Sequence, residues 1–359
     1  MAAIVTFGEI MARLAPPGVE RLRQSLPGTL NVTFAGAEAN TAVSLALLGR
    51  DVDFVTALPE GPLTEACLGS LRGTGVSTRH IRLTPHGRLG LFFVETGANQ
   101  RPTQVYYDRD HSSISQSAPG DFCWSEILKE ARWLHLTGIT AALSESAAEL
   151  TIQAAQTARQ LGVEVSFDVN FRSKLWRWDG AAQPQQLARR TLLRLLPHVS
   201  LWFFSEDDCR LLGLASEALQ TAGTRSERLV RAAREVQQQF PAIRYFAGTF
   251  REQISASHNN WSGLLFDATT SQAVEAPLRD GVVQPWEIRN IVDRVGSGDA
   301  FAAGILFGLS QPAANLQYTI DFATAAGCLA HSISGDWNYV SRAEIEELMH
   351  GAGAGRVVR

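Results

Sequence analysis

The sequence predicts an α/β fold in which helices cover a mostly parallel central sheet and a small β-sheet stands apart as a lid. Short apolar runs alternate with longer segments whose apolar residues recur at helical spacing, as in parallel strands joined by helices. The region 88–110 breaks this alternation with two β-rich runs and a turn. No linker-like stretch divides the 359 residues, so we expect a single domain over 1–359.

The first strand–helix–strand unit begins with an apolar run at 3–7, which predicts a buried strand. Small and apolar residues then follow at helical spacing over 36–48. Gly49 ends this run at a position where a helix commonly finishes on glycine. A second strand is expected at 53–57. The same order recurs in the middle of the chain, with strands predicted at 133–136, 163–168 and 201–204 and a helix at 144–161.

The lid is predicted from the runs 89–95 and 103–108, which are rich in β-branched and aromatic residues. The residues between them favour a turn, so the two runs form a hairpin outside the main sheet. Further strands are expected near 11–34, which places the lid in segments near 11–34 and 88–110. An exposed lid sheet commonly needs a partner to cover it, and we therefore expect a homo-oligomer.

Composition excludes several classes of function. A formal net charge of −4 gives no basic surface for nucleic acid or for an anionic membrane. No apolar run is long enough to span a bilayer, and the first residues do not resemble a signal peptide, so a cytoplasmic protein is expected. The cysteines are scattered, which favours free thiols over disulfides or zinc. Neither lysine follows a glycine, which excludes a Walker P-loop.

The segment 293–299 reads Asp-Arg-Val-Gly-Ser-Gly-Asp and precedes an apolar helix predicted at 300–309. Gly296 and Gly298 would let backbone N–H groups converge at the positive end of this helix, where an anion binds. Asp299 would lie beside that anion. Because a carboxylate repels phosphate unless it accepts a proton, we expect a general base for an attacking hydroxyl. From these residues alone, a helix cap on a tight turn is the alternative.

Two segments resemble signatures of the ribokinase-like (PfkB) carbohydrate kinases. Residues 293–304 are similar to the C-terminal signature, and the glycine-rich stretch 35–49 resembles the N-terminal one, although Ala35 replaces a glycine. The resemblance implies a three-layer ribokinase-like core with a β-lid. It also implies phosphoryl transfer from ATP, with Mg²⁺, to a sugar. Asp299 would be the base, and the amides of Gly296, Ser297 and Gly298 would hold the developing charge.

Within that family, several stretches resemble 2-keto-3-deoxygluconate kinases: 36–40, 100–102, 106–109, 168–172, 175–176 and 334–338. The resemblance implies a small-molecule sugar-acid substrate in a pocket under the lid, bound by Gly36, Asn40, Tyr107, Arg109, Arg172 and Asp336. A planar guanidinium suits the carboxylate of such a sugar. The residues alone leave Arg109 open as a solvated lid arginine, and Arg172 open as an ion-pair partner of Asp168 or a triphosphate ligand.

The same resemblance implies a nucleotide groove formed by Asn170, Ser205, Thr249, Arg251, Thr324 and Gly327. The usual Asn-x-x-Glu motif of the family reads Ser-Glu-Asp-Asp from Ser205 to Asp208, which departs from the pattern near the expected Mg²⁺ network. No protein side chain is assigned as a metal ligand. Fructose or 2-keto-3-deoxygalactonate remains an alternative substrate, and a non-catalytic sugar-sensing protein is the alternative from another functional class.

Overall fold

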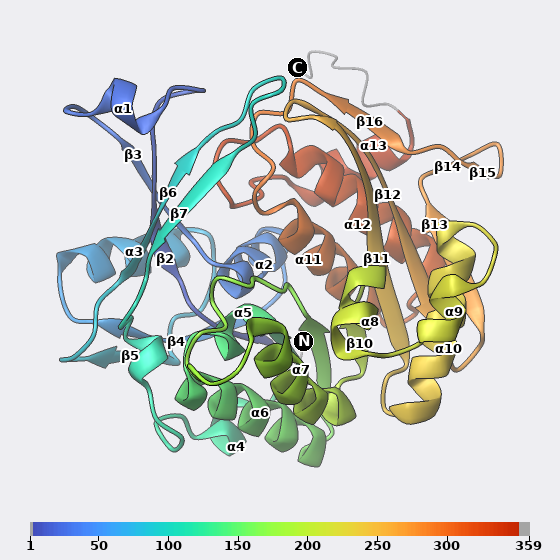
Figure 1. Cartoon of the computed structure of the whole chain (residues 1–359), viewed down its shortest axis with the longest axis horizontal. Helices are drawn as coiled ribbons and strands as arrows, with labels where there is room; N and C mark the ends of the chain where they lie inside the picture. Colours follow the sequence, from blue (N-terminus) through green and yellow to red (C-terminus); the bar gives the residue numbers. More distant parts are fainter. Residues whose placement is uncertain (1–2, 352–359) are drawn as a thin grey trace.

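A ten-stranded sheet forms the centre of the computed structural model, which describes residues 3–351 (Figure 1). The strand order is β13-β12-β11-β10-β9-β8-β1-β4-β5, with β16 paired to β12. The parallel part comprises β1 (Ala3–Phe7), β4 (Val52–Pro59), β5 (Ile81–Thr84), β8 (Ala131–Thr137), β9 (Glu164–Asp168), β10 (Leu201–Phe203) and β11 (Tyr245–Ser255). The antiparallel part comprises β12 (His258–Asp267), β13 (Gln272–Ala276) and β16 (Trp286–Arg289).

Helices cover both faces of this sheet and enclose two separate apolar cores. One face carries α4 (Trp124–Ile127), α5 (Gly138–Ala141), α6 (Glu145–Gln160), α7 (Pro184–Leu195), α8 (Glu206–Leu212), α9 (Ser216–Gln220) and α10 (Arg225–Gln239). The other carries α2 (Ala37–Leu47), α3 (Pro62–Gly73), α11 (Ser297–Leu309), α12 (Leu316–Ala330) and α13 (Arg342–Met349). The predicted three-layer α/β core is therefore confirmed.

A second sheet of four strands stands beside the core, at the upper left of Figure 1. Its order is β3 (Asn31–Ala35), β2 (Met11–Ala15), β6 (Gly90–Glu95) and β7 (Gln104–Asp108), and the short helix α1 (Leu22–Ser25) lies between β2 and β3. Met11, Ala35, Phe92 and Val94 give it a small apolar core of its own. The small separate sheet is therefore confirmed, with β6 and β7 forming the expected hairpin and β2 and β3 lying within residues 11–35.

Several boundaries differ from the sequence-based expectation. The apolar helix begins at Ser297 rather than at residue 300, so Gly298 and Asp299 lie inside its first turn. The long antiparallel pair β11–β12 was not expected, because its apolar alternation breaks down beyond Phe250, where β11 leaves the core. A minor hairpin, β14 (Leu278–Arg279) with β15 (Val282–Val283), and two 3₁₀ turns, η1 (Ile114–Gln116) and η2 (Leu196–His198), complete the elements described.

No helix within residues 3–351 has both the length and the apolar character needed to cross a membrane. The four cysteines, Cys67, Cys123, Cys209 and Cys328, are free thiols, as their spacing predicted.

Candidate active site

The glycine-rich turn before α11 has the geometry that an anion site needs. Gly296 adopts a left-handed conformation, with φ of 86°. A Cβ placed on it would lie 2.2 Å from the backbone oxygen of Asp336, so conformation and space both require glycine there. Gly298, in contrast, has no neighbouring atom within 4 Å of such a Cβ and lines the main cavity. The first turn of a helix leaves N–H groups without helical acceptors, and these are available to a ligand.

Asp293 fixes the shape of this turn with hydrogen bonds from three backbone amides. Its Oδ1 accepts from the N–H groups of Arg294 (2.8 Å) and Val295 (3.1 Å), and its Oδ2 accepts from Gly335 (3.3 Å). Ser297 adds a hydrogen bond from its Oγ to the backbone oxygen of Arg294 (3.0 Å). The turn that leads to the amides of residues 296–298 is therefore held in shape by side chains that the loop itself supplies.

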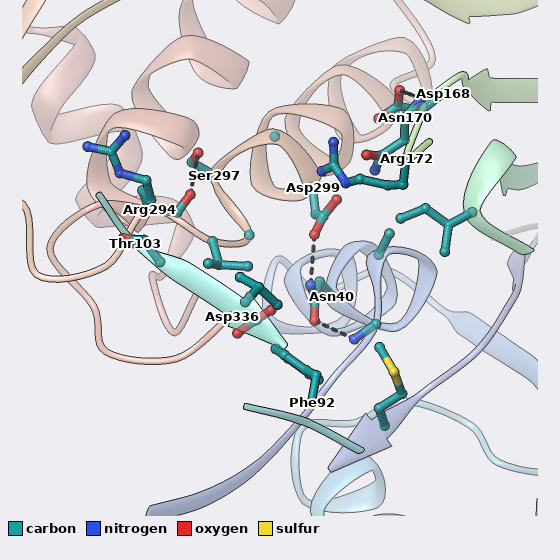
Figure 2. A pocket seen from close by; sticks show the side chains of 18 of the residues that line it. Asn40, Phe92, Thr103, Asp168, Asn170, Arg172, Arg294, Ser297, Asp299 and Asp336 are labelled. Carbon is teal, nitrogen blue, oxygen red and sulfur yellow. Dashed lines mark hydrogen bonds between the residues drawn. The ribbon is translucent and has the colours of Figure 1, made fainter. Parts of the chain in front are cut away.

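Asp299 lies at the start of α11 and points toward Asn40 on α2 (Figure 2). Asn40 donates from Nδ2 to Oδ2 of Asp299 (2.7 Å), and its own Oδ1 accepts from the N–H of Gly36 (3.2 Å). The pKa of Asp299 is raised to about 8, mainly by burial and also by the nearby carboxylates of Asp168 and Asp336, while the Asn40 hydrogen bond opposes the shift. An oriented carboxylate with a pKa close to neutrality suits proton transfer.

A cavity of about 760 Å³ opens onto Asp299, and it is bounded by both the lid and the core. The lid contributes Met11, Phe92, Gln104 and Tyr107, among others. The β11–β12 pair contributes Thr249, Arg251 and Trp261. The volume falls within the range of small-molecule sites. Segments far apart in the sequence thus meet around one carboxylate.

The cavity carries a cluster of cationic side chains, comprising Arg172, Lys174, Arg225, Arg251 and Arg294. Burial lowers the pKa of Arg251, and the neighbouring Arg172 lowers it further, as expected for a buried cation next to another cation. This concentration of positive charge suits a multiply charged anion such as a triphosphate. Sequence reasoning missed Lys174, Arg225 and Arg294 as site residues. Arg294 lies inside the glycine-rich signature and could have been found from it, whereas Arg225 carries no such signal.

All six residues predicted for the sugar line the cavity: Gly36, Asn40, Tyr107, Arg109, Arg172 and Asp336. Arg109 is not a solvated lid residue, since only 5% of its side chain is exposed and it forms an ion pair with Glu9. Its guanidinium also lies 5.2 Å from the Tyr107 ring centre, within cation–π range. A Cβ on Gly36 would lie 2.0 Å from the backbone oxygen of Glu9, so this wall tolerates no larger residue.

Two further carboxylates near the cavity have perturbed pKa values. Burial raises the pKa of Asp336 to about 6, against the lowering effect of Arg13, with which it forms an ion pair. Burial likewise raises the pKa of Asp168 to about 6, while Arg172 lowers it. No ion pair joins Arg172 to Asp168 in the part of the chain that the structure describes, so the guanidinium remains available to a ligand.

Of the six residues predicted for the nucleotide, Asn170, Thr249 and Arg251 line the cavity, but Ser205, Thr324 and Gly327 do not. Ser205 instead caps α8 and donates from its Oγ to Asp208 (2.6 Å). Thr324 and Gly327 lie behind Trp261, which donates from Nε1 to the backbone oxygen of Thr324 (3.1 Å). The Trp261 indole therefore lies between α12 and the cavity, and it lines the cavity in place of Thr324 and Gly327.

Within residues 3–351, no three His, Cys, Asp or Glu side chains are grouped closely enough to hold a metal ion by themselves. Asp168 and Asp208 are nevertheless close enough to influence each other, because Asp168 adds to the burial that raises the pKa of Asp208 to about 7. A hard cation such as Mg²⁺ commonly uses one or two protein carboxylates together with phosphate oxygens and waters. Asp168, which lines the cavity, fits that limited role, and Asp208 is a neighbouring carboxylate.

Comparison with known proteins identifies the family. The family model described as pfkB family carbohydrate kinase matches residues 1–244. The chain is 30% identical to the 2-dehydro-3-deoxygalactonokinase of Haloferax volcanii over 99% of its own length and 98% of that protein's. It is 27% identical to the fructokinase of Klebsiella pneumoniae over 86% of its own length and 84% of that protein's. The crystal structure of 2-dehydro-3-deoxygluconokinase from Thermotoga maritima superposes with a TM-score of 0.87 at 38% identity, covering 98% of this chain and 100% of that one.

The fold and the site therefore define a sugar-phosphorylating enzyme of the three-layer α/β type. The chain belongs to the pfkB family of carbohydrate kinases, as the two glycine-rich signatures indicated.

Proposed function

We propose that this kinase transfers the γ-phosphoryl group of ATP to the terminal hydroxyl of 2-keto-3-deoxygluconate, the sugar also called 2-dehydro-3-deoxygluconate. The observation that carries the proposal is the arrangement of Asp299, oriented by Asn40, beside an open glycine turn in a cavity rich in arginine. A base, an anion site and cationic walls are the parts that phosphoryl transfer to a hydroxyl requires.

In this mechanism Asp299 accepts the proton of the attacking hydroxyl through its carboxylate, while Asn40 holds that carboxylate in place. The amides of Gly296, Ser297 and Gly298 stabilise negative charge that develops on the transferred group. Arg251 and Arg294 bind the phosphates, and the lid excludes water from the reacting atoms. Mg²⁺, when bound with ATP, supplies charge neutralisation at the phosphates, and Asp168 with Asp208 would hold it through oxygen ligands or waters.

The preference for a sugar acid is supported by the excess of cationic groups in the cavity and by the names of the relatives. Because Arg109 already pairs with Glu9, we assign the sugar carboxylate first to Arg172, which has no ion-pair partner among residues 3–351, with Arg109 completing the wall. Full-length relatives named for the 2-dehydro-3-deoxy sugar acids support this assignment. The galactonate epimer and fructose are the alternative substrates, the latter because of the fructokinase relative.

A coupled assay of ADP release with a sugar panel tests the proposal. We expect the highest kcat/KM with 2-keto-3-deoxygluconate or its galactonate epimer and little turnover of fructose. Turnover of fructose alone would overturn the sugar-acid assignment. Sugar binding by calorimetry without any ADP release would instead favour a sugar-sensing protein.

A further inference from the structure

Arg13 is a buried lid residue that reaches the catalytic loop. It lies on β2, and only 3% of its side chain is exposed. Its guanidinium forms ion pairs with both Asp293 and Asp336, which belong to the last fifth of the chain. Met11, two residues earlier on the same strand, lines the cavity, and side chains two apart on a strand share a face. Arg13 therefore extends from the cavity side of the lid into the core.

The contact with Asp293 connects Arg13 to the anion site. Asp293 is the residue whose carboxylate accepts hydrogen bonds from the amides of Arg294, Val295 and Gly335. A carboxylate can accept several hydrogen bonds at once, so the same group can hold the loop amides and the guanidinium. The position of the glycine turn thus depends on the Asp293 carboxylate, which is paired with Arg13 of the lid.

The contact with Asp336 connects Arg13 to the base. Asn40 is close enough to Asp336 to contribute to lowering its pKa, and the Asn40 amide donates to Asp299. The backbone oxygen of Asp336 also lies directly against Gly296. Figure 2 shows both Asp299 and Asp336 near Asn40, and a dashed line joins Asn40 to Asp299 alone. The lid strand is therefore linked to Asp336 by an ion pair, and Asp336 lies next to the Asn40 side chain that holds the base.

We propose that Arg13 is a positioning residue that couples the closed lid to both the base and the anion site. The inference rests on the proposed function, because it assigns the lid to the sugar and Asp299 to proton transfer. A bidentate guanidinium can bridge two carboxylates, whereas a lysine ammonium is a point charge and cannot keep both contacts in that geometry. When the bridge is lost, sugar still binds, but the hydroxyl, the base and the loop amides are no longer aligned.

The first test compares Arg13→Lys with the control Arg21→Gln, a half-exposed lid arginine that pairs with Glu95. We expect Arg13→Lys to lower kcat about 100-fold, the size of loss that small misplacement of reacting groups causes, and to leave the KM for sugar nearly unchanged. Arg21→Gln should leave both unchanged. A normal kcat in folded Arg13→Lys, or a raised KM with normal kcat, would overturn the proposal.

A rescue experiment separates positioning from simple structural support. In Arg13→Ala, millimolar guanidinium chloride should restore part of kcat, whereas sodium chloride at the same ionic strength should not. Restoration by both salts, or by neither, would count against a specific role of the guanidinium. If Arg13 variants do not fold, Asp293→Asn tests the proposal instead. This change removes one of the two carboxylates that pair with Arg13 and leaves the guanidinium paired with Asp336 alone. It should lower kcat without raising KM, and an unchanged kcat would overturn the coupling.

Hydrogen exchange distinguishes failure of this inference from failure of the proposed function. Without sugar, the amides of residues 294–298 should exchange faster in Arg13→Lys than in the wild type, since exchange reports local opening. They should not do so in Arg21→Gln. Unchanged exchange would contradict the coupling even if no tested sugar were phosphorylated.

Discussion

The two sides of the cavity differ in how closely they follow the sequence motifs. On the side that we propose for the sugar, every residue that the motifs indicated lines the cavity, from Gly36 and Asn40 to Asp336. On the side that we propose for the nucleotide, Ser205, Thr324 and Gly327 lie outside it, and Trp261, Arg225 and Lys174 line it. The sugar side is built from glycine turns and short strands whose geometry is local. The nucleotide side depends on how large side chains of the β11–β12 pair pack against α12.

Asp299 serves both sides of the cavity, so we expect a change at this residue to affect the reaction most. Asp299→Asn removes the proton acceptor but keeps a hydrogen-bonding side chain next to Asn40. We expect kcat to fall at least about 10³-fold, within the range for loss of a general base, with little change in sugar affinity. Steady-state kinetics and calorimetry measure the two effects. Asp179→Asn on an exposed loop is the matched control, and near-normal turnover of Asp299→Asn would remove Asp299 from the role of base.

A change on the nucleotide side should affect ATP alone. Arg251→Gln removes one cation of the cluster, and Arg251 has no ion-pair partner among residues 3–351. We expect the KM for ATP to rise about tenfold, the cost of one charge-assisted hydrogen bond, and the sugar KM to stay constant. Exposed Arg289→Gln, also at the edge of the β12 pairing, serves as the control. A rise in the sugar KM instead would place Arg251 on the other side of the cavity.

A change on the sugar side should distinguish acidic from neutral sugars. Arg109→Ala removes a buried cation and leaves Glu9 without its partner. We expect the KM for the sugar acid to rise several-fold and the KM for fructose to change little. Glu9→Gln is the informative companion, because it frees Arg109 and should not raise the KM for the acid. If both variants raise the KM for the sugar acid and for fructose equally, the Glu9–Arg109 pair supports the cavity wall and does not contact the carboxylate of the sugar.

The smallest effect concerns pH. Since Asp299 must be deprotonated to accept a proton and its pKa is raised to about 8, kcat/KM should increase with pH and level off above that value. As pH falls through 8, the protonated fraction grows and activity declines. Glu38 is one of the carboxylates that raise the pKa of Asp299, so Glu38→Gln should move this limb to lower pH. A profile that is flat from pH 6 to 9 would contradict the perturbed base.

The sequence was sufficient for the layered fold, the lid and the Asp299 turn, because these depend on periodicity, glycine positions and short motifs. It could not reveal Arg13, since an arginine in the strand Met11–Ala15 has no local pattern and its partners follow about 280 and 320 residues later. It also could not place Thr324 behind Trp261, because that depends on how α12 packs against β12. These contacts depend on distant packing, which sequence motifs do not encode, whereas Arg294 lies inside a motif and could have been found from it.

The central claim is that this chain phosphorylates the terminal hydroxyl of a 2-keto-3-deoxy sugar acid at Asp299. Phosphorus and carbon NMR of the product formed from ATP and 2-keto-3-deoxygluconate tests it most directly, with the Asp299→Asn chain run in parallel. We predict a phosphate ester on the terminal carbon with the wild type and none with the variant over the same time. Phosphate at another hydroxyl, or equal product from the variant, would contradict the account.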